Sequence, residues 1–230
     1  MNKLDKRLSA VASFVRDGSY LADIGTDHAY LPIYCVKKGK SISAIASDIN
    51  EKPYLTAKSN VAGAKLSDKI KFVQAYGFDG MEDYLFTDVA VCGMGGELIR
   101  DIIKNGEYSY DRIKSNAVRL ILQPMTMTAV LRGYLYDNGY DIVGESTVYD
   151  DGRYYNILCA EYTGIIQQAD SFRVMFGDIK GEYFESNFAF TRYISKESLK
   201  YKRIAAGKKS AGLDVSFENE IIEKLEAVIK

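Results

Sequence analysis

The chain has few of the residues that build metal centres and disulfide frameworks. Only three cysteines and one histidine occur in 230 residues. Cys35, Cys92 and Cys159 lie far apart in apolar runs and show no C-x-x-C spacing, so neither a zinc cluster nor a disulfide framework is expected. We predict buried, reduced thiols and no bound metal.

Long apolar runs are also missing. No stretch approaches the ~18 apolar residues that cross a bilayer. Residues 1–15 are typical of a charged amphipathic helix rather than a signal peptide, because Leu4, Leu8, Val11, Ala12 and Val15 share one face. We therefore expect no membrane contact, a cytoplasmic location and a monomer.

The chain as a whole has almost no net charge, but one segment is strongly basic. The chain has 30 basic and 31 acidic residues, yet between Arg192 and Lys209 seven basic residues meet the single acid Glu197. This run is either a solvated helix face or a surface for nucleic acid, with Tyr193 and Tyr201 stacking on bases. The second interpretation is favoured, and its candidate contacts are Arg192, Lys200, Lys202 and Arg203.

Short aliphatic runs alternate with helical patterns as far as about Tyr162, which is typical of a mostly parallel sheet with crossover helices. The predicted strands are Tyr20–Ile24, Ser43–Asp48, Ile70–Gln74, Val89–Cys92 and Val118–Gln123. The predicted helices between them are Tyr30–Lys38, Lys52–Ala62, Gly96–Lys104 and Met127–Asn138. Two further runs, Asp141–Tyr149 and Tyr154–Tyr162, have only a short polar turn between them and predict an antiparallel hairpin. The fold class is therefore α/β, with a seven-stranded sheet.

After Gly164 the pattern becomes helical. Helices are predicted over Ser186–Ala206 and Phe217–Ile229, joined by Gly207–Leu213 and packed as an antiparallel pair. We thus expect a domain over residues 1–164 and a helical extension over residues 165–230.

The candidate ligand site begins where the first two strands end. Asp23 and Gly25 follow one strand and Asp48 ends the next, at a spacing suited to carboxylates that hold ribose hydroxyls. The three glycines of the dinucleotide fingerprint are missing, which favours a ligand with ribose but no phosphates, such as S-adenosylmethionine. The candidate cofactor residues are Asp23, Ile24, Gly25, Asp48, Ile49, Asn50, Asp79, Gly80 and Gly93.

Several of these assignments have structural alternatives. Asp23 or Asp48 could simply cap a turn, and Asp79-Gly80 could be an ordinary turn instead of a contact for the adenine amino group. Gly93, with Gly95 and Gly96, follows the fourth strand at the point where a doubly wound sheet opens its crevice, so the glycines would let a base approach the backbone; the alternative is a tight turn.

The candidate catalytic residues are Asp27, His28, Gly93 and Met94. The histidine could equally be structural, and the methionine could be plain packing. The candidate substrate contacts near the sheet are Gly95, Gly96, Gln123, Pro124 and Tyr155, with proline-enforced loop geometry as the alternative for the Gln-Pro pair.

Taken together, these segments resemble the bacterial TrmK family, the tRNA (adenine-22-N1)-methyltransferases. The segments concerned are Leu21–Ile33, Ala46–Asn50, Gly93–Gly96, Leu120–Pro124 and Tyr154-Tyr155. The resemblance implies a Rossmann-like class I methyltransferase domain with a coiled-coil-like extension, which uses S-adenosylmethionine to methylate N1 of an adenine in tRNA. It also implies a cofactor site at Asp23, Gly25, Asp48 and Asp79, with Asp27, His28 and Gly93–Gly96 on the substrate side.

The expected chemistry depends mainly on alignment. We hypothesise that the pocket holds N1 of a flipped-out adenine in line with the methyl group, while Asp27 offsets the positive charge that develops on the base. Two alternatives remain: a nicotinamide-dependent oxidoreductase, which needs room for a pyrophosphate, and a non-catalytic RNA-binding protein on the same fold.

Overall fold

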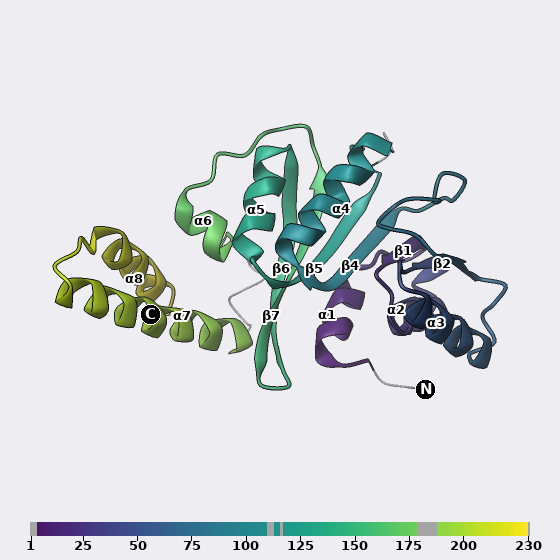
Figure 1. The fold of residues 1–230 in the computed structure, drawn as a ribbon, viewed down its shortest axis with the longest axis horizontal. Helices are drawn as coiled ribbons and strands as arrows, with labels where there is room; N and C mark the ends of the chain where they lie inside the picture. The colour runs from purple at the N-terminus through teal and green to yellow at the C-terminus, as the bar shows by residue number, and fades with distance from the viewer. Residues whose placement is uncertain (1–3, 110–112, 116, 179–187, 230) are drawn as a thin grey trace.

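A seven-stranded sheet forms the centre of the computed structural model, which describes residues 4–109, 113–115, 117–178 and 188–229 (Figure 1). The strand order is β3-β2-β1-β4-β5-β7-β6. The strands are β1 (Ser19–Ile24), β2 (Ser41–Ser47), β3 (Ile70–Val73), β4 (Asp88–Gly95), β5 (Arg119–Thr126), β6 (Tyr140–Asp150) and β7 (Arg153–Tyr162). Within this described sheet β7 alone runs antiparallel to its neighbours, so the predicted fold class is confirmed.

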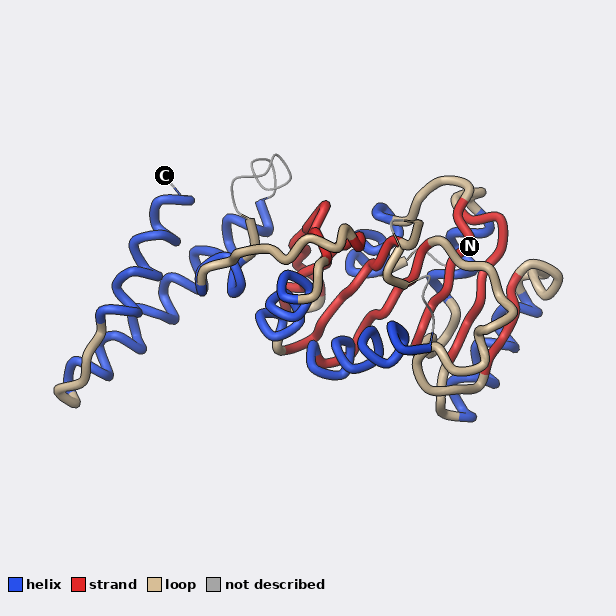
Figure 2. Tube along the Cα trace, turned by 90° about the horizontal axis from the view of Figure 1, so that it is seen from above, coloured by secondary structure: helices blue, strands red, loops and turns tan. Residues whose placement is uncertain are grey.

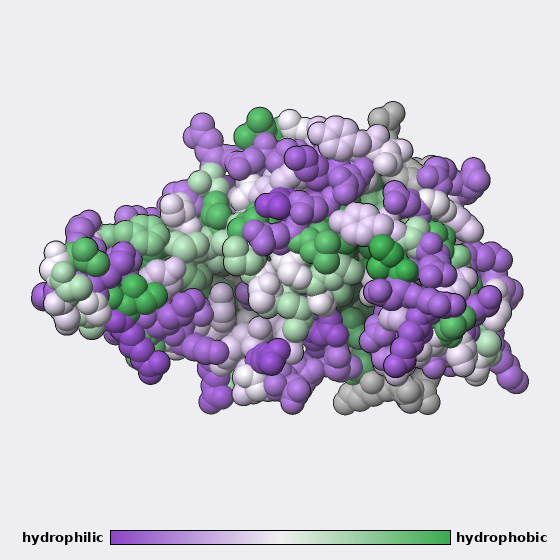
Figure 3. Space-filling model, in the orientation of Figure 1, coloured by the Kyte–Doolittle hydropathy of each residue, from purple (hydrophilic) through white to green (hydrophobic). Residues whose placement is uncertain are grey.

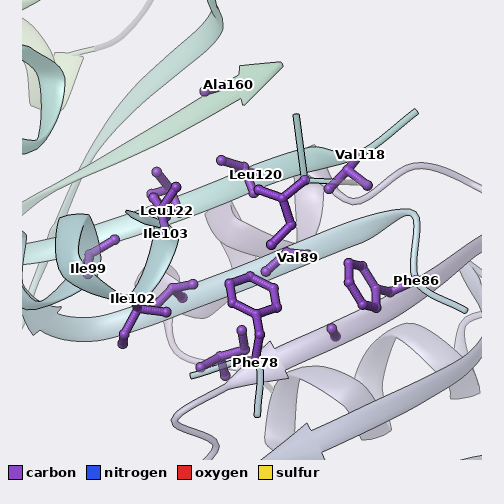
Figure 4. Packing of buried hydrophobic residues seen from close by; sticks show 14 of the residues in the cluster. Phe78, Phe86, Val89, Ile99, Ile102, Ile103, Val118, Leu120, Leu122 and Ala160 are labelled. Atoms are coloured by element: carbon purple, nitrogen blue, oxygen red, sulfur yellow. The ribbon is translucent and has the colours of Figure 1, made fainter. Parts of the chain in front are cut away.

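Helices cover both faces of the sheet (Figure 2). They are α1 (Lys6–Phe14), α2 (Tyr30–Lys37), α3 (Glu51–Gly63), α4 (Gly96–Ser109), α5 (Thr128–Asp137), α6 (Ser171–Phe176), α7 (Phe188–Ser210) and α8 (Ser216–Ile229). Alternate strand residues supply two cores. For example, Leu120 and Leu122 pack with Ile99, Ile102 and Ile103 of α4 (Figure 4), whereas Ile121 belongs to the core under α1, α2 and α3.

The register brings the ends of β1, β2 and β4 to one edge of the sheet. Asp23 on β1 lies opposite Ala46 on β2 and Ala90 on β4. The strand order reverses between β1 and β4, where a doubly wound sheet opens its binding crevice. The first candidate acid therefore lies at the switch point.

Strands β4 and β5 are longer than predicted. β4 continues to Gly95 and β5 to Thr126, so Gly93 and the Gln123-Pro124 pair lie within strands instead of in the loops expected for them. The β4–β5 register shifts on either side of Met94. A bulge there interrupts the hydrogen bonds between the two strands and so accommodates the glycines and the proline.

The C-terminal helices α7 and α8 form an arm beyond β6 (Figure 1). As predicted, they pair antiparallel, since Lys208 near the end of α7 bonds Glu218 near the start of α8. The helix α7 includes Gly207 and ends at Ser210, so the connection is shorter than predicted. The predicted start at Ser186 lies outside the described residues. On the arm, apolar spots lie among hydrophilic side chains (Figure 3).

The short helix α6 was not predicted. Asp170 caps it by accepting a hydrogen bond from the Arg173 backbone N–H at 2.8 Å. Six residues are too few for a helical pattern to stand out in the sequence. Phe176 at its end packs into the core of the arm, so α6 links the sheet domain to the extension.

Two further observations concern membranes and thiols. In the part of the chain that the structure describes, no helix is long and apolar enough to cross a bilayer. Cys35 and Cys159 are buried free thiols, as predicted, while Cys92 is half-buried beside the sheet edge.

Candidate active site

Two cavities meet at the sheet edge where β1, β2 and β4 end. The smaller has a volume of about 160 Å³ and the larger about 710 Å³. Gly25 and Met94 line both. A Cβ on Gly25 would lie 1.9 Å from the Met94 Cε, and Gly25 has φ +76°, so the methionine packs flat on the glycine and forms the wall between the cavities.

The lining of the smaller cavity suits an adenosine group. Asp48 is buried, and its Oδ1 accepts hydrogen bonds from the Asn50 backbone N–H at 2.8 Å and side-chain Nδ2 at 3.2 Å. No described residue bonds its Oδ2, so this oxygen can accept from a ribose hydroxyl. Apolar walls that suit a purine surround it. They come from Ile24, Ile49, Met94, Leu98 and Ile102.

The larger cavity contains a buried carboxyl. Asp23 Oδ2 accepts a hydrogen bond from Thr26 Oγ1 at 2.6 Å. Burial raises the pKa of the Asp23 carboxyl from 3.8 to about 6, while the Thr26 bond and the positive charge of Arg7 oppose this rise and the Asp48 charge adds to it. Asp23 is therefore ionised at neutral pH, and its buried charge lowers the stability of the protein when no ligand is bound.

Gln123 has a different position from the one predicted. It is fully buried, and its Oε1 accepts hydrogen bonds from Arg7 Nη1 at 2.8 Å and from the Gly93 backbone N–H at 3.2 Å. Instead of reaching over the crevice, Gln123 ties α1 to the ends of β4 and β5. Pro124 lies beside it in β5, opposite Met94.

Asp27 and His28 lie at the mouth of the larger cavity. The Asp27 side chain is 69% exposed, and its Oδ2 is 3.2 Å from His28 Nε2. The His28 ring stacks on Tyr30, with centroids 5.0 Å apart and planes 16° apart. These contacts orient the histidine, and the Asp27 carboxylate, although paired with it, is exposed enough to face an entering base.

Some predicted residues lie elsewhere. Asp79 and Gly80 do not line either cavity; tight turns there bury Phe78 in the core and leave Asp79 exposed. Gly77 lines the smaller cavity instead. Gly96 serves close packing, since a Cβ on it would lie 2.3 Å from a backbone oxygen before α5. Gly95 also lies outside both cavities, whereas Tyr155 lines the larger one.

The basic run on α7 is partly neutralised, contrary to expectation. Lys200 pairs with Glu197 at 2.9 Å, and Lys202 pairs with Glu226 of α8 at 2.5 Å. Arg192 and Arg203 form no ion pair with described residues, and all four lie outside the two cavities. The tyrosines expected to stack on bases are also occupied: Tyr193 packs against Tyr154, and the Tyr201 hydroxyl lies 3.3 Å from Met175 Sδ.

Sequence reasoning missed the contribution of α1 and of the hairpin turn. Arg7 lines the larger cavity, and its guanidinium lies 5.9 Å from the Tyr155 ring centroid. The spacing of Arg7 from the apolar residues Leu4 and Val11 places it on the buried face of the helix, and this signal could have found it. The other unpredicted lining residues with polar side chains are Asp5, Thr26, Tyr30, Asp150 and Asp151.

Known proteins are similar to this chain in both sequence and fold. A family model described as a methyltransferase domain matches residues 4–158. The tRNA (adenine(22)-N(1))-methyltransferase of Bacillus subtilis is 34% identical over 197 residues, which cover 85% of this chain and 81% of the relative. The chain belongs to the TrmK family.

Solved structures of similar proteins contain the cofactor or its product. Sp1610 of Streptococcus pneumoniae, in complex with S-adenosyl-L-methionine, is 33% identical with a TM-score of 0.83, over 99% of this chain and 100% of that one. TrmK of M. capricolum, in complex with S-adenosyl-homocysteine, is 28% identical with a TM-score of 0.82, over 100% of both chains. The TrmK resemblance seen in the sequence motifs is confirmed.

Proposed function

We propose that this TrmK-family chain transfers the methyl group of S-adenosylmethionine to N1 of adenine 22 in tRNA. The observation that carries the proposal is the pair of cavities that meet at Gly25, one suited to adenosine and the other lined by acids. The relatives' names and bound cofactors support the same reaction.

We assign the adenosine part of the cofactor to the smaller cavity, and its methionine part and the target base to the larger one. Asp48 would hold the ribose hydroxyls in the smaller cavity, with Asn50 fixing the orientation of its carboxylate. Asp23 in the larger cavity would face the cationic amino group of the methionine part. Gly93, at φ +80°, leaves the neighbouring wall without a side chain, so a base edge can approach the backbone there.

The larger cavity has the charge that this reaction needs. When bound, the cofactor supplies a methyl group that passes from sulfur to the N1 lone pair, which leaves a neutral thioether and a positively charged base. Five carboxylates and one guanidinium line the cavity, and a surplus of negative charge stabilises a developing cation. The carboxylates are Asp5, Asp23, Asp27, Asp150 and Asp151, and the guanidinium is Arg7.

Asp27 is the carboxylate proposed to act on the target base, and Asp27→Asn tests this role. Because the side chain is largely exposed, we expect kcat to fall about tenfold, or about 1.4 kcal/mol of transition-state stabilisation. Affinities for S-adenosylhomocysteine and tRNA should be unchanged in titration experiments. Asp137→Asn, at an exposed position ending α5, is the matched control and should keep the parental rate.

Separate outcomes contradict separate parts of the proposal. An Asp27→Asn enzyme that turns over at the parental rate removes the role of Asp27 only. Undiminished methyl incorporation into a transcript with adenine 22 replaced would refute the target. Titration in which NAD binds and S-adenosylhomocysteine does not would favour the oxidoreductase alternative.

We also propose that residues 1–164 carry the chemistry while residues 165–230 help to dock the tRNA. Arg192 and Arg203, which form no ion pair with the described residues, support the second role. Lys200 and Lys202 are no longer proposed as contacts, because their ammonium groups are already paired with glutamates.

A further inference from the structure

A third cavity lies between the β6–β7 hairpin and the start of α7. Its volume is about 410 Å³. Unlike the larger cavity at the sheet edge, called the reaction cavity from here on, it has two cationic side chains and no carboxylate among its described lining residues. They are Lys6, Thr147, Val148, Tyr149, Phe188, Ala189 and Arg192.

Exposed aromatic rings border this cavity. Phe188 is 70% exposed and Tyr149 is 46% exposed. The Tyr149 ring packs on Tyr154 with centroids 4.9 Å apart, and the Arg192 guanidinium lies 4.4 Å from the Phe188 centroid. Rings that are held in place yet open to solvent are the platforms on which unpaired bases stack.

The cations beside these rings are available for phosphate. Arg192 and Lys196 form no ion pair with the described carboxylates, and Lys196 Nζ lies 5.5 Å from the Tyr154 centroid. Lys6 Nζ donates a hydrogen bond to the Tyr149 carbonyl oxygen at 3.4 Å and forms no ion pair with the described carboxylates. We call Lys6, Tyr149, Tyr154, Phe188, Arg192 and Lys196 the hairpin–α7 surface.

The hairpin turn connects this surface to the reaction cavity. Asp150 and Asp151 line the reaction cavity, and Asp150 Oδ2 accepts a hydrogen bond from the Lys6 backbone N–H at 3.0 Å. Both α1 and α7 contact the hairpin, which lies between them in Figure 1. A phosphate backbone is repelled by the acids on one side of the turn and attracted by the cations on the other.

We propose that the hairpin–α7 surface binds tRNA nucleotides adjacent to the one being methylated, with phosphates at Lys6 and Arg192 and a base on Phe188. This inference rests on the proposed function. It places the strongest RNA contact at the first turns of α7, next to the hairpin, ahead of Arg203 and the rest of the basic run.

The test is tRNA binding by the full-length chain, measured by fluorescence anisotropy at several salt concentrations. Arg192→Gln and Lys6→Gln should each weaken binding about tenfold, and each should reduce the slope of log K against log salt by about 1, because one phosphate contact is lost. Phe188→Ala should weaken binding at least fivefold without changing that slope. Arg192→Lys should recover most of the affinity.

The matched control is Lys209→Gln. Like Arg192→Gln, this substitution removes one positive charge from α7, and Lys209 likewise has no ion pair with described residues. Lys209, however, lies at the far end of the helix. We expect its affinity for tRNA to stay within twofold of the parent. S-adenosylhomocysteine affinity and thermal unfolding should be unchanged in every variant, which shows that the fold is retained.

Two results would overturn the inference. Equal losses for Arg192→Gln and Lys209→Gln would mean that the arm attracts RNA along its whole length. Parental binding by the Lys6, Phe188 and Arg192 variants would mean that this surface is not used. If the parent binds tRNA through the surface yet transfers no methyl group, the proposed function fails and the surface stands.

Discussion

Replacing Asp23 by asparagine should stabilise the empty protein while abolishing cofactor binding. The carboxyl is buried, and its burial raises the pKa to about 6. Asparagine has almost the same shape, carries no charge, and keeps an oxygen that can accept the hydrogen bond from Thr26. The variant therefore removes the penalty of a buried charge and leaves the local hydrogen bond in place.

The size of the effect follows from the pKa. In the unfolded chain Asp23 titrates near its ordinary value of 3.8, so folding takes up a proton between that pH and about 6. Stability consequently falls as pH rises through this window, and the full penalty is present above it. A rise in the Asp23 pKa from 3.8 to about 6 lowers the free energy of unfolding by about 3 kcal/mol at pH 7.5 and by about 1 kcal/mol at pH 4.5.

Thermal unfolding at the two pH values measures this difference. At pH 7.5, about 3 kcal/mol should raise the Tm of Asp23→Asn by about 6–12 °C in a chain of this size, and most of this gain should disappear at pH 4.5. Saturating S-adenosylhomocysteine should raise the Tm of the parent but not of the variant. Asp27→Asn, which removes an exposed carboxylate, is the control and should unfold close to the parent. A variant that melts at or below the parent at pH 7.5, or gains equally at both pH values, would refute the reasoning.

Two further substitutions test the packing around the site. Gly25→Ala forces a side chain onto φ +76° and into the Met94 methyl group; stability should fall by about 1–3 kcal/mol in denaturant titration, and S-adenosylhomocysteine affinity should fall at least tenfold because Met94 is driven into the cavities. Glu145→Gln leaves the Arg132 guanidinium buried without its carboxylate partner, now 2.9 Å away, and should cost about 3–5 kcal/mol in the same assay. The control Glu161→Gln breaks an ion pair that is a quarter exposed and should cost under about 1 kcal/mol; a loss as large as that of Glu145→Gln would contradict this account.

Local sequence patterns were enough to place the sheet and its first two acids. Apolar runs of strand length ending in an acid located Asp23 and Asp48, and the parallel topology brought those strand ends together without further information. The hairpin was equally local, since a two-residue turn at Asp151-Gly152 joins two alternating strands. These features depend on neighbours in the sequence or on a general rule of topology.

The contacts that sequence could not supply are those between distant segments. Arg7 meets Gln123 across 116 residues of chain, and no local pattern names such a partner. The pairing of Lys202 with Glu226 depends on how α7 and α8 align, so counting charges within one helix overestimated the free positive charge. For Asp79, the turn around it buries Phe78 and so directs the acid to solvent, which composition alone does not show.

The buried charge of Asp23 and the acids at the mouth of the larger cavity affect which ligands bind there. An ionised carboxylate away from water destabilises the empty fold, and a cation that enters the cavity relieves that instability, so part of the binding free energy comes from the strain of the empty site. A neutral ligand or a phosphate gains nothing from the same arrangement. We therefore expect the larger cavity to select positively charged ligands, with part of that selectivity coming from the instability that Asp23→Asn would remove. The phosphates that this cavity repels would bind at the hairpin–α7 surface instead.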